Sequence, residues 1–237
     1  KAIAPGVTTQ ALDELAEQFI RDNGGIPGFK GLYGCPSTIL TSVNDVIIHG
    51  LPGDYVLQEG DIVSCDCGVL MDGFYGDHCY TFPVGEISQE AQQLLTVTQQ
   101  CLAAAIDQVA AGKRIGDIGF AVQQHALQQG YSVVKEFVGH GLGEKMHEAP
   151  EVPNYGIRGR GPRIQEGMVL AIEPMINQGK REIKRHSDGW TISTRDGKLA
   201  AHFEHDVAFI DGQAEVLSTF RYVEEALGIT SPVTYGP

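Results

Sequence analysis

An internal repeat constrains the fold of this chain more than any other feature of the sequence. Residues 57–66, LQEGDIVSCD, match residues 164–173, IQEGMVLAIE, without a gap, and in both copies QEG precedes an apolar strand that ends in a carboxylate. His49 in IIHGL likewise matches His140 in VGHGL. Because a repeated segment folds as a repeated structural unit, the sequence predicts two related halves packed about a pseudo-twofold axis, with equivalent strands at the centre.

Each half also contains a segment that predicts a helix. The segments that start at Ile3 and at Val109 both open with a loop, continue with apolar residues at helical spacing and end at a glycine. In the first segment the expected apolar face consists of Leu12, Leu15, Phe19 and Ile20. We therefore expect helices outside the central strands.

The repeat pairs three polar positions: His49 with His140, Asp66 with Glu173, and Asp77 with Glu204. If the halves converge, four carboxylates and a histidine meet, and like charges a few Å apart in a low dielectric repel strongly. Two divalent cations would neutralise the four carboxylates. This oxygen-rich ligand set with one imidazole favours manganese, iron or cobalt, and zinc is an alternative.

Residues 64–80, SCDCGVLMDGFYGDHCY, contain two of these carboxylates and predict a β-hairpin. The Asp72-Gly73 dipeptide between alternating segments favours a two-residue turn, because both residues tolerate a positive φ. That turn sets a register with three informative pairs: Met71 with Phe74, Gly68 with Asp77, and Asp66 with Cys79. Asp66 and Asp77 then lie diagonally on one face, and Gly68 leaves space for an ion between them.

Two other interpretations of this hairpin are open from its residues alone. The aspartates could cap turns at the rim of a sheet, or Cys65, Cys67 and His78 could bind zinc. The register places these three residues on the face opposite the aspartates, so the two sets cannot form one site. We expect the three residues in the core, because free cysteine behaves as a small buried hydrophobe.

The composition limits the class of protein and its compartment. The 237 residues suffice for one large domain or two small ones, and no proline- or serine-rich linker divides them. A net charge of −13 disfavours binding to nucleic acid, which depends on lysine and arginine. Five cysteines, an odd number, favour a reducing compartment. With no signal peptide and no apolar run of transmembrane length, we expect a cytoplasmic protein without membrane contact.

Six motifs in order resemble the type I methionine aminopeptidases of the bacterial kind. They are HGLP at His49, CDCGVLMDGFYGD with Asp66 and Asp77, GHGLGEKMHEAP with His140 and His147, AIEPM at Glu173, DGW at Trp190, and FEH at Glu204. The resemblance runs from about Ile3 to about Ser218. It implies the α+β pita-bread fold, in which helices cover the outer face of a curved, mostly antiparallel sheet.

The resemblance also implies a domain organisation. We expect one metallopeptidase domain over residues 1–237, with pseudo-twofold related halves at about 1–100 and 101–218 and a C-terminal tail at 219–237. Members of the family usually begin with a further helix ahead of IAPGV, and this sequence lacks it.

Five metal ligands follow from the resemblance: Asp66, Asp77, His140, Glu173 and Glu204. Asp77 and Glu204 would bridge two ions, Asp66 would bind one ion alone, and His140 with Glu173 would bind the other. A water shared by two such ions loses its proton near neutral pH and becomes a nucleophile.

The same resemblance assigns three catalytic residues. Glu173 would accept a proton during attack. His147 would contact the carbonyl oxygen of the substrate or the oxyanion that follows. His49 would hydrogen-bond the scissile amide. Outside these motifs, either histidine would be interpreted as an ordinary loop residue.

Specificity for methionine requires a small apolar pocket with adaptable walls. By motif position the resemblance places seven side chains there: Phe29, Leu32, Cys35, Leu40, Phe137, Met146 and Trp190. An ordinary core role is equally open for Phe29 and Leu40. Leu32 and Cys35 stand where tyrosines are common in the family.

Two further departures from the family pattern lie close to the ligands. Gly68 and Asp206 replace hydroxyl residues. Asp206 shares a strand face with Glu204, so it either tunes the site or faces solvent.

The predicted activity is removal of the N-terminal methionine from peptides and nascent proteins. Two alternatives are a proline-specific aminopeptidase or prolidase of the same fold and a non-catalytic binding module. The expected partner is a peptide with an N-terminal methionine, the ribosome is a further candidate, and we expect a monomer.

Overall fold

The computed structural model describes residues 1–228. Its helices are α1 (Thr9–Asp22), α2 (Gln89–Ile106), α3 (Ile115–Gln128) and α4 (Arg221–Leu227), with one 3₁₀ turn, η1 (Leu32–Gly34). Its strands are β1 (Ile26–Pro27), β2 (Ile39–Val43), β3 (Val46–Ile48), β4 (Ile62–Met71), β5 (Phe74–Pro83), β6 (Ser132–Val133), β7 (Gly139–Gly141), β8 (Glu148–Val152), β9 (Val169–Ile172), β10 (Met175–Asn177), β11 (Ile183–Arg185), β12 (Ile192–Thr194), β13 (Ala200–His202), β14 (His205–Ile210) and β15 (Gln213–Val216).

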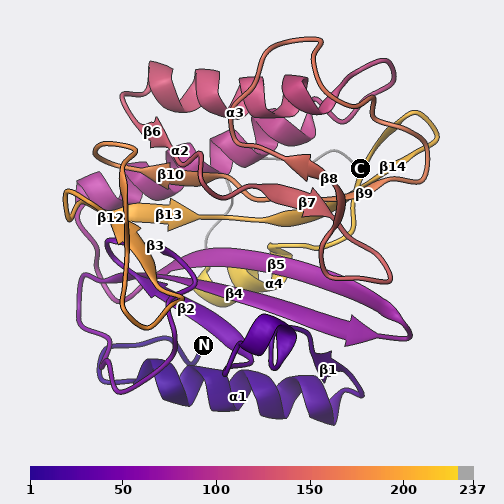
Figure 1. Ribbon diagram of the computed structural model, residues 1–237. Helices are drawn as coiled ribbons and strands as arrows, with labels where there is room; N and C mark the ends of the chain where they lie inside the picture. Colours follow the sequence, from indigo (N-terminus) through magenta and orange to yellow (C-terminus); the bar gives the residue numbers. More distant parts are fainter. Residues whose placement is uncertain (229–237) are drawn as a thin grey trace.

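Most of the strands form two layers that face each other, with α1 outside one layer and α2 and α3 outside the other (Figure 1). Strands β11, β12 and β3 form a further three-stranded sheet. In the first layer, β4 pairs with β1, β2 and β5, and α1 covers the outer side. In the second layer, the order β15-β14-β9-β7-β8 forms one sheet and β13-β10-β6 another, with α2 and α3 outside. Strand pairs among the described residues are all antiparallel, which confirms the predicted α+β class with a mostly antiparallel sheet.

The hairpin of β4 and β5 has the predicted register. Met71 pairs with Phe74, Gly68 with Asp77, and Asp66 with Cys79. The turn residues Asp72 and Gly73 have φ values of 50° and 87°, the left-handed conformation that this turn requires. The prediction that placed the two carboxylates on one face is therefore confirmed.

The two layers meet where β5 approaches β13 and β14. The Glu204 backbone N–H donates to Cys79 O at 2.9 Å, and the Thr81 hydroxyl donates to His202 O at 2.7 Å. The central strands of the two halves are thus tied directly to each other, which brings residues more than a hundred positions apart into contact.

Helix α1 follows its predicted pattern only in part. Thr8 caps it by accepting a hydrogen bond from the Ala11 N–H, and Leu12 is buried against the first layer. Leu15 and Phe19, expected on the buried face, are 53% and 69% exposed. The buried face instead includes Asp13, whose carboxylate accepts hydrogen bonds from the backbone N–H groups of Thr38 and Ile39, so that part of the prediction was wrong.

The largest hydrophobic cluster lies between α2, α3 and the second layer, and it includes Leu94, Leu102, Val122 and Leu170. The expected boundary near residue 100 falls inside α2, which packs against α3, β9, β10 and β13.

The cysteines of the hairpin lie on the far face of β4, as expected. Cys65 and Cys67 pack against a cluster that includes Leu12 and Val63, and His78 stacks 5.0 Å from Phe220. All three residues are partly buried and pack against apolar neighbours, so they lie at the edge of the core rather than within it. Of the expected tail, residues 219–228 include α4, and residues 229–237 lie outside the described part.

Candidate metal centre

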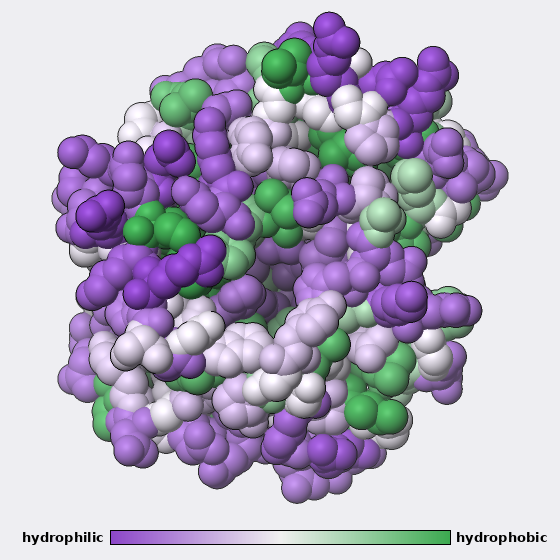
Figure 2. Space-filling view, viewed as in Figure 1, coloured by the Kyte–Doolittle hydropathy of each residue, from purple (hydrophilic) through white to green (hydrophobic). Residues whose placement is uncertain are grey.

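A cavity of about 260 Å³ lies between the two layers. Figure 2 shows a hollow at the centre of this face of the molecule. Its lining residues are Phe29, Leu32, Tyr33, Cys35, Leu40, His49, Asp66, Asp77, His140, His147, Glu173, Trp190 and Glu204. The cavity therefore combines a polar end, which contains all five predicted metal ligands, with apolar and aromatic walls.

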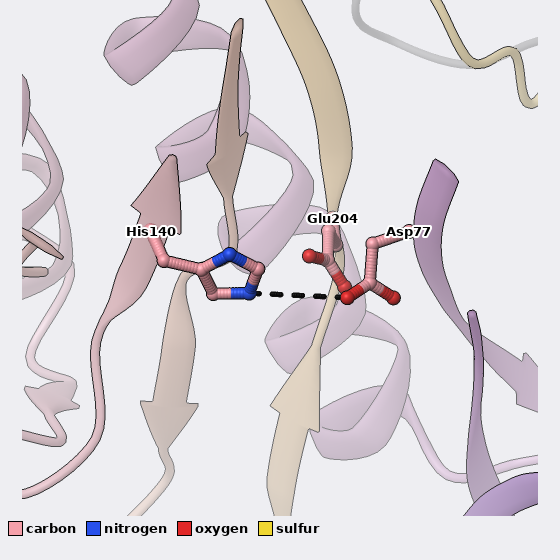
Figure 3. Close-up of side chains that lie close together, drawn as sticks. All are labelled: Asp77, His140 and Glu204. Carbon is pink, nitrogen blue, oxygen red and sulfur yellow. Dashed lines mark ion pairs between the residues drawn. The ribbon is translucent and has the colours of Figure 1, made fainter. Parts of the chain in front are cut away.

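Three of the ligands form a compact group that could hold a metal ion. Asp77 comes from β5, His140 from β7, and Glu204 from the link between β13 and β14. One ligand atom of each lies within 4.8 Å of the others, and all three residues are buried. The three side chains point toward one another in Figure 3, where the dashed line joins His140 Nε2 to Asp77 Oδ2 at 3.8 Å.

The remaining two predicted ligands adjoin this group. Glu173 follows β9 directly, and its Oε1 lies 3.6 Å from His140 Nε2. Asp66 lies on β4 diagonal to Asp77 and lines the same cavity. The structure thus brings the five residues from separate strands of both halves into one site.

The protonation of His140 is set by its second ring nitrogen. Nδ1 lies 2.9 Å from Gly141 O. A carbonyl oxygen can only accept, so Nδ1 carries the proton and Nε2 presents a lone pair toward the carboxylates. Burial lowers the pKa of His140 to about 4, which keeps the ring neutral, as a metal ligand must be.

The carboxylates are held in conditions that favour bound cations. Burial, followed by the charges of neighbouring carboxylates, raises the pKa values of Asp66, Asp77, Glu173 and Glu204 well above their ordinary values. Asp66 Oδ1 and Glu204 Oε1 are buried and have no hydrogen-bond partner within residues 1–228. Such a group is costly unless positive charge offsets it, so the donor set fits divalent metal ions.

The two predicted catalytic histidines lie at the edge of this group. The His147 ring is 4.3 Å from the His140 ring, and burial lowers the pKa of His147. His49 adopts a positive φ of 58°. Burial, then the charges of His147 and Arg185, lowers the pKa of His49 to about 4. Both rings are therefore neutral at pH 7, and each can donate one N–H.

The predicted pocket residues fall into two groups. Phe29, Leu32, Cys35, Leu40 and Trp190 line the cavity. Phe137 instead packs edge-on to His49 at 5.5 Å, and Met146 lies behind Phe29, where its Cε fills the space beside Gly68. These two side chains support the wall and are not among the lining residues of the cavity.

The sequence did not point to two residues of the site. His202 is 2% exposed, and its Nε2 lies 3.6 Å from Glu173 Oε2. Its position two residues before Glu204 could have indicated a shared strand face. Tyr33 is 77% exposed, lines the cavity and lies 5.6 Å from the His147 ring. Its φ of 52° has no signal in the sequence.

Comparison with known proteins decides the family. A family model described as metallopeptidase family M24 matches residues 1–210. The chain belongs to metallopeptidase family M24. It is 49% identical to methionine aminopeptidase of Clostridium perfringens over 219 residues, which covers 92% of this chain and 88% of that protein. It is 45% identical to methionine aminopeptidase 1 of Bacillus subtilis over 218 residues, with the same shares covered.

Solved structures agree with this assignment. Methionine aminopeptidase from Rickettsia prowazekii superimposes with a TM-score of 0.89 at 40% identity, and the match covers 90% of this chain and 87% of that one. Prolidase from Pyrococcus furiosus matches with a TM-score of 0.72 at 20% identity and covers 92% of this chain but 57% of that one, which shows the shared fold alone. The resemblance to type I methionine aminopeptidases and the pita-bread fold are confirmed.

Proposed function

We propose that this protein is a metal-dependent aminopeptidase that removes the N-terminal methionine from peptides and nascent proteins. The observation that supports it most is the placement of a buried carboxylate and histidine cluster at one end of an apolar cavity of about 260 Å³. Relatives at 49% and 45% identity carry the name of this activity.

The cofactor we propose is a pair of divalent ions, drawn from cobalt, manganese, iron and zinc. Asp77 and Glu204 would be shared, Asp66 would hold one ion, and His140 with Glu173 would hold the other. When bound, divalent ions lower the pKa of a coordinated water and polarise a carbonyl group.

The residues of this chain would supply the remaining steps. Glu173 would accept a proton in the cavity that it lines, where its Oε1 lies 3.6 Å from His140 Nε2 and its Oε2 lies 3.6 Å from His202 Nε2. His147, neutral at pH 7, can donate its N–H to a carbonyl oxygen as negative charge develops there. His49 can hydrogen-bond the scissile amide, and its packing against Phe137 and Trp190 fixes the orientation of its ring.

The apolar wall supports a methionine side chain as the group recognised. Phe29, Cys35 and Leu40 are each at most 7% exposed and line the cavity together with Trp190. Met146 behind them adds a flexible, polarisable side chain, which lets the wall adapt to a thioether.

A peptide panel tests the activity and separates it from the prolidase alternative. We expect release of methionine from Met-Ala-Ser in the presence of Mn²⁺ or Co²⁺ and no release of the first residue from Ala-Pro peptides. Glu173→Gln should abolish release, whereas Glu215→Gln, an exposed change on strand β15, should retain it. Preferred cleavage of Ala-Pro would establish the prolidase activity instead, and no cleavage with metal bound would establish a binding module.

We further propose that the protein acts as a cytoplasmic monomer on nascent chains at the ribosome. Among residues 1–228, no helix combines the length and apolar character that crossing a bilayer needs. Size-exclusion chromatography and co-sedimentation with ribosomes test the two parts of this proposal separately.

A further inference from the structure

A fifth carboxylate, Asp206, lies beside the four carboxylates among the five predicted ligands. It belongs to β14 and is only 5% exposed, so it does not face solvent. Its Oδ2 accepts a hydrogen bond from the backbone N–H of Asp77 at 2.7 Å. The contact joins the two halves of the molecule at the residue that is central to the ligand group.

The register of the second layer directs Asp206 toward the site. Asp206 and His140 are both paired with Ala171, one on each side of β9. Directly opposed residues in neighbouring strands project to the same face of a sheet. The Asp206 side chain therefore lies on the same face as the His140 ring.

The Asp206 carboxylate lies next to the ligand carboxylates. It is one hydrogen bond away from Asp77 and two residues after Glu204. Its own Oδ1 is buried and has no hydrogen-bond partner in the described part of the chain. A buried carboxylate that accepts one hydrogen bond and has no cation beside it is costly. A divalent ion bound by the neighbouring carboxylates would offset its negative charge.

We propose that Asp206 is a positioning residue of the metal centre, which fixes the backbone of Asp77 and adds a negative charge that strengthens the binding of divalent cations. The inference rests on the metal site of the proposed function. Asp206 does not need to bind an ion directly. Its hydrogen bond holds the backbone of Asp77 in place, and its negative charge attracts a cation bound at the neighbouring carboxylates.

A purely structural role makes a different prediction. In that case the hydrogen bond to Asp77 would only hold β5 against β14. Asp206→Asn preserves the shape and a carbonyl acceptor for that bond but removes the charge. A structural role therefore predicts unchanged metal affinity in this variant, whereas the proposed role predicts weaker affinity.

Calorimetric titration of the metal-free full chain with Mn²⁺ tests the inference. Partners that support metal ligands typically change affinity by about 10–100-fold when altered, and we expect the Kd of Asp206→Asn to rise by about that factor. Removal of one charge from a repelling cluster should leave the Tm of the metal-free variant equal to or above that of the wild type. Glu215→Gln removes an equal charge from the exposed strand β15, opposite Ala208 of β14, and should bind Mn²⁺ as the wild type does.

The outcomes separate this inference from the proposed function. If the wild type binds Mn²⁺ and Asp206→Asn binds it equally well, the inference is overturned and the metal centre stands. An equal loss in Glu215→Gln would also overturn it, because net charge alone would then explain the effect. If the wild type itself binds no Mn²⁺, Co²⁺ or Zn²⁺, the proposed metal centre fails and this inference fails with it.

Discussion

Glu204→Gln should make the protein more stable than the wild type when no metal is bound, and this advantage should shrink or reverse when metal is present. Ligand oxygens of Asp77 and Glu204 lie within 4.8 Å of each other. At an effective dielectric constant of about 20, two charges at this separation repel by about 3 kcal/mol. The variant is spared this repulsion, so without metal it should be up to about 3 kcal/mol more stable than the wild type, which corresponds to a Tm about 6–12 °C higher.

The advantage of the variant should depend on pH in a defined direction. The pKa of Glu204 is raised in the folded protein by burial and then by Asp77, so the folded state holds this proton more tightly than the unfolded chain does. Above the ordinary pKa of about 4.5 the unfolded chain binds fewer protons, and the free energy of unfolding of the metal-free wild type therefore decreases as pH rises. The variant lacks this loss, so its advantage should grow from pH 5 to pH 8.

Thermal unfolding in EDTA and in excess Mn²⁺ measures both effects. Binding to the folded wild type at about 100 times the Kd adds about 2.7 kcal/mol, whereas the variant has lost a shared ligand and should gain little. The wild type should therefore be the less stable protein in EDTA and recover most of the difference, or overtake the variant, in Mn²⁺. A variant that is less stable than the wild type in EDTA at pH 8 would refute the argument that uncompensated carboxylate charge destabilises the metal-free site.

Three further substitutions test the proposed oxyanion donor, the packing of the pocket wall and the hydrophobic core. His147→Ala should lower turnover by about 10²–10³-fold through loss of a donor to the developing oxyanion, with metal content by elemental analysis unchanged; loss of metal would refute its assigned role. Gly68→Ala would place a methyl group against Met146 Cε and 2.6 Å from Phe29 Cε1, which would displace the pocket wall. The KM for methionyl peptides should therefore rise about 10-fold or more, with the affinity for Mn²⁺ unchanged. An unchanged KM would refute this packing argument. Phe220→Ala should lower the free energy of unfolding in urea by about 3–5 kcal/mol. Phe220 is 2% exposed and packs against His78, Tyr80, Phe203 and His205. A decrease of less than about 1 kcal/mol would contradict its place in the core.

The sequence predicted those features of the fold that depend on local pairing. The register of β4 and β5 followed from the Asp72-Gly73 turn, because a two-residue loop allows only one pairing, and the structure has that pairing. The repeat pointed to Asp66 and Glu173 as equivalent positions, and both line the cavity. Roles within the site came from family resemblance and not from spacing.

Features that depend on contacts between distant strands were not predictable. His202 reaches Glu173 because β13 pairs with β10, with His202 opposite Met175. The spacing of His202 from Glu204 indicates a shared strand face but does not specify that register. The burial of Asp206 depends on the approach of β14 to β5, and its sequence position alone was equally compatible with solvent exposure. Helical spacing gave the apolar face of α1 but not the extent to which the sheet covers it.

Metal content and methionine release, measured on one preparation, show whether the activity depends on bound divalent metal. After exhaustive chelation the protein should contain no divalent metal and release no methionine from Met-Ala-Ser. Stepwise addition of Mn²⁺ should restore release in proportion to the metal bound, until the carboxylates around Asp77 and Glu204 are saturated. Full activity in protein shown to be free of metal would contradict a metal-dependent reaction at these carboxylates.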